Sequence, residues 1–266
     1  MTEQHQDIRA RPSGFVTDLV TIAGRALRSI PREKEVFIPA IFIPAFFFIV
    51  NIGALQDLTE SVPGSNFDYR AFQLPTAIIF AVTGVSRAAS LVTDIQTGYF
   101  DRLLLTPVKR LPLLLGLMIA DFVLVCALTI PVIILGFILG VGFETGVLGL
   151  LAFILIAGSW GLAFTGFPYA IALKTGNPAA VGSSFLLFFP FAFLTTSTVP
   201  LDALTGWLRS IARFNPLTYI LDAMRSLVTE GWDGAALGKG LLAIMIVGVI
   251  SQTMALAALR GRIKRN

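Results

Sequence analysis

The chain has 266 residues, of which 55% are hydrophobic and only 14% are charged, and its mean hydropathy is +0.81. Soluble domains carry about 25% charged residues, so this composition predicts an integral membrane protein and leaves no room for a large soluble domain. The 20 basic residues exceed the 16 acidic ones, but they flank apolar runs, so nucleic acid is not an expected partner.

Residues 1–35 are predicted to form a cytoplasmic tail that contains an amphipathic helix. Its apolar and polar faces recur at three- and four-residue spacing, the first with Phe15, Leu19, Ile22, Ala23, Ala26 and Ile30, the second with Asp18, Thr21, Arg25 and Arg28. This pattern is typical of a helix in the membrane interface, with its cations near lipid phosphates. The alternative is an amphipathic helix packed on a soluble partner.

Six apolar runs follow, each about as long as the roughly 20 residues that a helix needs to cross a bilayer core of about 30 Å. They are residues 36–55, 71–93, 112–141, 146–173, 180–199 and 240–259. The predicted fold is therefore an all-α integral membrane protein, with a six-helix transmembrane domain over residues 36–266. Prolines occur inside several runs, where neighbouring membrane helices can satisfy the freed backbone groups, and we expect kinks there.

The basic residues predict the orientation, because short cytoplasmic loops of membrane proteins carry an excess of Lys and Arg. Five lie on one side of the runs, at Arg70, Arg209, Arg213, Arg225 and Lys239. Fourteen lie on the other, at residues 9, 11, 25, 28, 32, 34, 102, 109, 110, 174, 260, 262, 264 and 265. We therefore expect a multi-pass protein of the cell membrane whose two termini are both cytoplasmic.

Two ionisable residues lie inside the runs, Arg87 in the second and Asp121 in the third. A charge at membrane depth costs roughly 2.5–3.5 kcal/mol on insertion scales, so each needs a partner or water. One hypothesis is an ion pair between Arg87 and Asp121 that fixes the second and third helices. The alternative is that Arg87 reaches the interface alone and Asp121 faces a wet cavity.

Enzymatic chemistry is not expected from this chain. Cys126 and His5 are single, so no metal site, disulfide or Cys/His pair can be built from them. The phosphate-binding pattern GxxxxGK[ST] is absent, and Asp121 is the only acid well inside a run. We expect no bound cofactor.

Residues 94–110, DIQTGYFDRLLLTPVKR, separate the second and third runs on the predicted cytoplasmic side. Asp94 or Thr97 can cap a helix, three apolar residues supply one face, and Pro107 ends it. The pattern predicts a short amphipathic helix, either a simple connection or a docking element. Two more short helices are predicted over about 200–230, separated at Asn215-Pro216, and these are too short and polar to span.

Two motifs resemble one family. TGYFDRLLLTPVKR is similar to a block that follows the second membrane helix of type-2 export permeases of ABC transporters, which include daunorubicin-resistance permeases and polysaccharide exporters. RFNPLTYILDAMRSL, residues 213–227, is similar to a block before their last helix. The resemblance covers essentially the whole chain, although the start of residues 94–110 lacks the charged residues that the family often has there.

The resemblance implies a permease subunit that pairs with a second permease and with two separate ABC-type ATPase subunits, which bind ATP and Mg²⁺. It places six residues on a coupling helix that docks in the ATPase, namely Gly98, Asp101, Leu103, Leu104, Thr106 and Pro107. It also implies that Asn215, Pro216 and Tyr219 belong to short helices that re-enter the membrane on the outer side.

The cargo is expected to be hydrophobic or amphipathic, such as a lipid, a drug or a lipid-linked glycan. The runs are rich in Phe and poor in the charged rings that ion pathways need. The alternative function is a secondary transporter or channel that works without an ATPase. Such carriers usually show repeated halves and several intramembrane acids, and this sequence shows neither.

Overall fold

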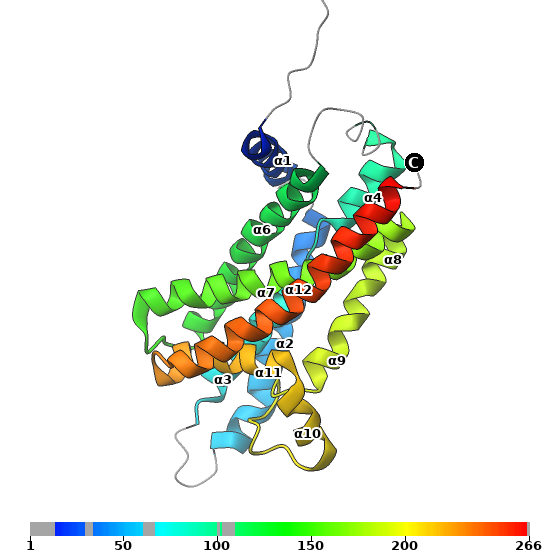
Figure 1. Ribbon diagram of the computed structural model, residues 1–266. Helices are drawn as coiled ribbons and strands as arrows, with labels where there is room; N and C mark the ends of the chain where they lie inside the picture. Colours follow the sequence, from blue (N-terminus) through cyan, green and yellow to red (C-terminus); the bar gives the residue numbers. More distant parts are fainter. Residues whose placement is uncertain (1–13, 30–33, 61–66, 100–101, 103–109, 265–266) are drawn as a thin grey trace, which may run out of the picture.

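The computed structural model describes residues 14–29, 34–60, 67–99, 102 and 110–264. Every regular element in this part of the chain is a helix. Helix α1 (Phe15–Ser29) and the C-terminus of α12 (Gly234–Ile263) lie at one end of the bundle, and α10 (Gly206–Phe214) lies at the other (Figure 1). We call these the α1 end and the α10 end.

Five helical stretches in the described chain are long and apolar enough to cross a membrane. Four correspond to predicted runs, with ends shifted by a few residues: α2 (Lys34–Glu60), α6 (Arg110–Ile138), α7 (Gly146–Thr175) and α12. Helix α12 begins six residues before the predicted start at 240. The protein is thus an all-helical, multi-pass membrane protein, as its composition predicts.

The fifth stretch, Tyr69–Gln96, is interrupted at residues 84–87, between α3 (Tyr69–Thr83) and α4 (Ala88–Gln96). This break was not expected, because the sequence has no proline there. The prolines lie instead inside continuous helices, with Pro44 in α2, Pro131 in α6 and Pro168 in α7. Proline in a membrane helix therefore does not mark where this chain leaves helical geometry.

The predicted span 180–199 is shorter than expected. Helix α8 (Pro178–Ser183), a 3₁₀ turn (Ser184–Leu187) and α9 (Phe188–Phe193) give 16 helical residues, Pro178–Phe193. That stretch is about 24 Å long, less than the hydrocarbon core of about 30 Å. Residues 194–199 are not helical, which corrects the predicted boundary. Thr and Ser favour turns over helix interiors, and the run TTST begins at Thr195, two residues after the last helical residue Phe193.

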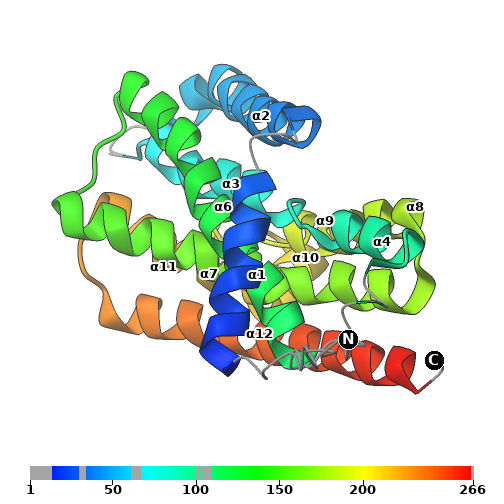
Figure 2. The ribbon, with the colours of Figure 1, turned by 90° about the horizontal axis from the view of Figure 1, so that it is seen from above.

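The helices are layered from α2 at one edge to α12 at the other, with α3, α6 and α7 between them (Figure 2). Only 17% of the apolar window of α2 is buried, compared with 67% for α3–α4. Trp160 of α7 lies fully buried at the centre, and its Nε1 donates to Thr83 Oγ1 at 2.8 Å. Helix α7 is therefore the central helix of the bundle, and α2 is the most peripheral.

The predicted short helices near the outer side are present as α10 and α11 (Pro216–Arg225), followed by one π-helical turn (Ser226–Glu230). Both are too short to cross a membrane. The first of them begins at Gly206, after a turn at residues 201–203, and not at about 200 as predicted.

Candidate functional site

The predicted coupling helix lies mostly outside the described residues. Asp101, Leu103, Leu104, Thr106 and Pro107 are all in that part. Residues 94–96 belong to the end of α4, so Asp94 lies inside a helix and does not cap one. Gly98 has a φ of +71°, and its carbonyl accepts the amide of Arg102 at 3.1 Å. This left-handed conformation suits glycine, and the chain turns there at the α1 end.

Helix α1 contacts the first part of residues 94–110 through Arg25. The Arg25 Nη2 atom lies 3.2 Å from Asp94 Oδ2, and the Arg25 guanidinium lies 4.7 Å from the centre of the Tyr99 ring. Both contacts are partly exposed, which limits the stability they provide. They nonetheless join α1 to α4 on both sides of the Gly98 turn. The family's usual charges are absent at the start of this stretch, and Asp94 has its partner within the chain.

Helix α1 reaches this position because it packs closely on α6. A Cβ atom at Gly116 of α6 would lie 2.8 Å from Ile22 of α1, so only glycine allows this approach. Ala23 and Ala26 of α1 are buried on the same face. The apolar side of α1 therefore covers the beginning of α6, close to residues 94–110.

Asp121 of α6 is fully buried and connects three helices at the break in α3–α4. Its Oδ1 accepts the backbone amide of Arg87 at 3.1 Å, and its Oδ2 accepts the hydroxyl of Tyr169, on α7, at 2.8 Å. Arg87 is also buried. The structure thus brings the two predicted residues together through the backbone of Arg87. The ion pair between the guanidinium and the carboxylate stays a prediction.

The non-helical segment 194–199 lies at the α10 end, and side chains from other helices satisfy its carbonyl groups. Asn215 Nδ2 donates to Leu194 O at 2.7 Å, and Arg225 Nη2 to Thr196 O at 2.7 Å. Thr76 Oγ1 donates to Ser197 O, and the Tyr69 hydroxyl to Thr198 O, each at 3.2 Å. A backbone that leaves helical geometry at membrane depth must be satisfied within the protein, and α3 and α11 provide the donors.

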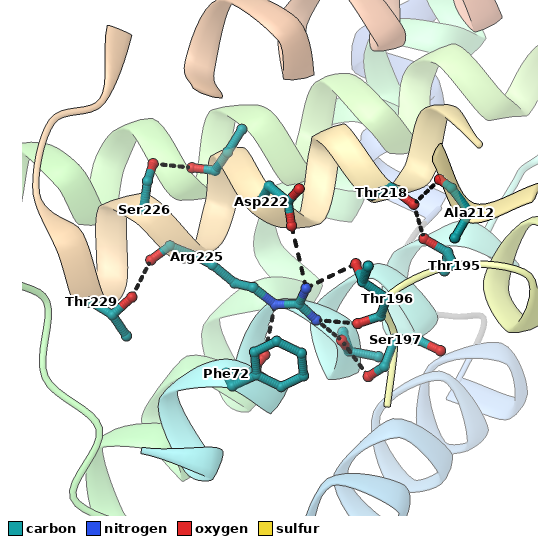
Figure 3. A network of polar contacts seen from close by, with 12 residues as sticks. Phe72, Thr195, Thr196, Ser197, Ala212, Thr218, Asp222, Arg225, Ser226 and Thr229 are labelled. Carbon is teal, nitrogen blue, oxygen red and sulfur yellow. Dashed lines mark hydrogen bonds and ion pairs between the residues drawn. The ribbon is translucent and has the colours of Figure 1, made fainter. Parts of the chain in front are cut away.

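Arg225 is the centre of this arrangement (Figure 3). Its Nε donates to Phe72 O at 3.1 Å, and its Nη1 donates to Thr196 Oγ1 at 3.0 Å. The guanidinium carbon lies 3.5 Å from the centre of the Phe72 ring, and Nη1 lies 3.5 Å from Asp222 Oδ1. Burial lowers the pKa of Arg225 to about 10, and Asp222 opposes that shift, so the guanidinium is charged at neutral pH.

Asn215, Pro216 and Tyr219 shape the turn between α10 and α11. Asn215 is buried, its Oδ1 accepts the amide of Leu217 at 3.0 Å, and Pro216 occupies the first helical position. The Tyr219 hydroxyl donates to Arg213 O at 2.6 Å. The predicted residues therefore form a capped helix–turn–helix that also anchors segment 194–199. Their re-entry into the membrane stays a prediction.

A cavity of about 750 Å³ opens beside Arg225 at the α10 end. Its lining includes Phe72 and Arg225 together with the acidic residues Asp68, Glu144, Asp222, Glu230 and Asp233. Asp68 and Asp233 also cap α3 and α12 through their carboxylates. The mouth of the bundle at this end is therefore acidic, and the buried guanidinium is its inner boundary.

The sequence pattern does not identify Arg225 as a site residue, because Arg225 enters there only as one of the five basic residues on one side of the apolar runs. A signal was present in the sequence. Arg225 follows Leu217 and Leu221 at four-residue spacing, so it lies on the apolar stripe of its helix. A basic residue on such a stripe needs buried partners, and the hydroxyl-rich run 195–198 supplies acceptors.

The comparisons with known proteins agree with one another. A family model described as "ABC-2 type transporter" matches residues 17–229. The chain is 28% identical over 237 residues to the "Daunorubicin resistance ABC transporter permease protein DrrB1" of Streptomyces coeruleorubidus, covering 87% of this chain and 78% of the relative. It is 27% identical over 218 residues to the "Probable doxorubicin resistance ABC transporter permease protein DrrC" of Mycobacterium tuberculosis, covering 82% and 79%. It is 25% identical over 224 residues to "Putative transport permease ycf38" of Cyanophora paradoxa, covering 81% and 76%.

Proposed function

The chain belongs to the ABC-2 type transporter family, and we propose that it is the membrane-spanning permease subunit of an ATP-driven exporter. The observation that carries this proposal is the family match over residues 17–229, which includes α1, the interrupted α3–α4 and α11. The two sequence blocks on which the resemblance was noted both lie within it. The proposed location is the cell membrane, with both termini in the cytoplasm.

We infer that two ABC-type ATPase subunits drive the exporter from the α1 end. Arg25 and Asp94 support this role, since they fix the chain on the N-terminal side of the Gly98 turn. The predicted stretch 94–110, with Leu103, Leu104 and Pro107, would then dock in the ATPase, and ATPase closure would be passed to α4 and α6. ATP and Mg²⁺ would be bound by the partner chains, while this chain pairs with a second permease subunit.

We further propose that the fifth crossing is made by α8 and α9 together with segment 194–199. Side chains of other helices donate hydrogen bonds to four backbone carbonyl groups of this segment, those of Leu194, Thr196, Ser197 and Thr198. These bonds support the proposal, because they would allow a non-helical backbone inside the membrane. Helices α10 and α11 would re-enter from the outer side. This arrangement gives six crossings, although only five helical stretches of the described chain have the required length.

The proposed cargo is a hydrophobic or amphipathic solute of drug size. Two relatives carry daunorubicin or doxorubicin resistance in their names. Large apolar side chains on α2 and α9, including Phe46, Phe47 and Phe193, are exposed in the single subunit. Such surfaces favour apolar solutes over small ions, which need rings of carbonyl groups or charges.

The test is to uncouple the permease from its ATPase. Leu104→Asp should abolish export of a fluorescent hydrophobic drug and weaken co-purification of the ATPase subunit, while the protein still inserts into the membrane. Leu104→Met is the matched control and should retain both properties. Full export by Leu104→Asp, or the absence of any ATPase from complexes isolated with the unmodified chain, would contradict the proposal.

A further inference from the structure

Helix α12 touches its neighbours most closely at two glycine contacts. A Cβ atom at Gly240 would lie 2.6 Å from the Cβ of Ala223, on α11. A Cβ atom at Gly166 of α7 would collide with the backbone of Ser251, whose hydroxyl donates to Ala163 O. Between Gly240 and Ser251, side chains on one face of α12 line a hollow.

The hollow is an apolar slot of about 590 Å³. Its α12 wall consists of Leu242, Ala243, Ile246, Val247 and Ile250. Aromatic side chains from four other helices form the opposite wall, namely Phe167 of α7, Phe191 of α9, Phe214 of α10 and Tyr219 of α11. We call this the α12 slot. It is separate from the acidic cavity beside Arg225, with which it shares no lining residue.

The dimensions of the slot limit what it can hold. Lys239 and Ile250, its first and last α12 residues, are 11 positions apart, or about 16 Å along the helix. A slot of this length and volume has room for an extended acyl chain. The length matches about half of a 30 Å hydrocarbon core, which is the depth of one leaflet.

The charge of the slot is confined to one end. Lys239 lies five residues from the start of α12, at the α10 end, and its side chain is exposed. Among the described residues it forms no ion pair, and Asp222, an acidic residue close enough to interact with it, is paired with Arg225. A lysine at the membrane surface attracts anionic lipid headgroups by about 1 kcal/mol. One cation above a narrow apolar slot complements an anionic amphiphile.

We propose that the α12 slot binds one anionic phospholipid from the leaflet at the α10 end, with an acyl chain between α12 and the aromatic wall and the headgroup phosphate at Lys239. The proposal depends only on the chain being a membrane protein, and it can be tested by equilibrium binding without an ATPase or transport.

The first experiment measures binding of fluorescent phosphatidylglycerol and phosphatidylcholine to the full chain in detergent micelles. Lys239→Gln should weaken binding of phosphatidylglycerol about fivefold and leave phosphatidylcholine unchanged, since about 1 kcal/mol corresponds to that factor. Lys174→Gln, an exposed lysine at the α1 end, is the control and should change neither. Equal binding of the two lipids by the unmodified chain would overturn the role of Lys239.

The second experiment fills the slot. Ile246 and Val249 are both exposed residues of α12, but only Ile246 lines the slot. Ile246→Trp should weaken binding of both lipids at least about tenfold, which corresponds to about 1.4 kcal/mol, and Val249→Trp should not. Equal effects of the two changes would overturn the proposal, as would a change in oligomeric state caused by Ile246→Trp with unchanged lipid binding, since the slot would then be a protein interface.

Labelling of the unmodified chain gives a test that requires no variant. A phosphatidylglycerol with a photoreactive group in its acyl chain should label residues 242–250 and the aromatic wall. Labelling confined to the exposed face of α2 would contradict the proposal.

Discussion

In the part of the chain that the structure describes, two arginines are buried, and each contacts a break in helical geometry, at opposite ends of the bundle. At the α1 end, Arg87 is the last residue of the break at residues 84–87, and its backbone amide contacts Asp121. At the α10 end, Arg225 lies inside α11, and its guanidinium contacts the non-helical segment 194–199. One break is thus held by a carboxylate that accepts hydrogen bonds, and the other by a cation that donates them.

The difference follows from which backbone groups each break exposes. At residues 84–87 the Arg87 amide, at the start of α4, has no partner within its helix, and the Asp121 carboxylate accepts it. In segment 194–199 the groups that need partners are carbonyl oxygens, and Arg225, Asn215 and Thr76 donate to them. The charge of the central residue at each break therefore matches the polarity of the backbone groups that it contacts.

The largest expected effect is at Arg225. Arg225→Ala removes donors to two carbonyl groups, and each unsatisfied buried group costs about 1–3 kcal/mol, so we expect a loss of about 3–5 kcal/mol in folding free energy. Thermal unfolding in detergent would measure it. The control, Arg209→Ala, removes an exposed ion pair with Asp202 and should cost less than about 1 kcal/mol. Similar unfolding temperatures for the two variants would contradict the central role of Arg225.

Asp121 should come next. Asp121→Ala leaves the Tyr169 hydroxyl and the Arg87 amide without an acceptor in a buried site, so the expected loss is about 2–4 kcal/mol. Asp202→Ala, at an exposed carboxylate, is the control, and unfolding in detergent is again the measurement. A loss no greater than that of Asp202→Ala would mean that water replaces the carboxylate.

The predicted ion pair can be isolated, because Arg87→Met removes the guanidinium and retains the backbone amide. In a double-mutant cycle with Asp121→Asn, we expect a coupling energy above about 1 kcal/mol. The swap of Arg87→Asp with Asp121→Arg should recover part of the stability that each single change loses. Coupling near zero would restrict the contact to the Arg87 backbone.

Individual donors to segment 194–199 should matter less. Tyr69→Phe and Thr76→Val each remove one hydrogen bond to a carbonyl group and should each cost about 1 kcal/mol. Thr253→Val, on the exposed side of α12, removes only bonds within its own helix and should have a smaller effect. If the Tyr69 and Thr76 variants matched it, Arg225 and Asn215 alone would hold the segment.

The smallest expected effect is at the exposed contact of the α1 end. Arg25→Gln should cost about 0.2–1 kcal/mol, and the difference from the unmodified chain should decrease at high salt, because exposed charges are screened. Unfolding at low and high salt would measure this. A larger, salt-independent loss would mean that the contact with the Tyr99 ring dominates.

The all-helical class and the positions of α2, α6, α7 and α12 could be predicted from the sequence, because an apolar run of about 20 residues can form few structures other than a helix in a bilayer. The break at residues 84–87 and the end of α9 at Phe193 could not be predicted. Both depend on donors and acceptors from distant helices, such as Asp121 and Arg225, and hydropathy does not report these. The pairing of Arg25 with Asp94 joins residues 69 positions apart, which no local pattern reveals.

The two glycine contacts of α12 also bear on how the protein responds to membrane thickness. The apolar stretch Gly234–Arg262 has 29 residues, about 43 Å of helix, which exceeds a core of about 30 Å unless the helix tilts. Gly240 and Gly166 fix the angle at which α12 crosses α11 and α7, so α12 cannot adjust its tilt alone. A thicker or thinner bilayer must therefore tilt these helices as a unit. We expect the stability and activity of the protein to vary with the acyl-chain length of the surrounding lipid.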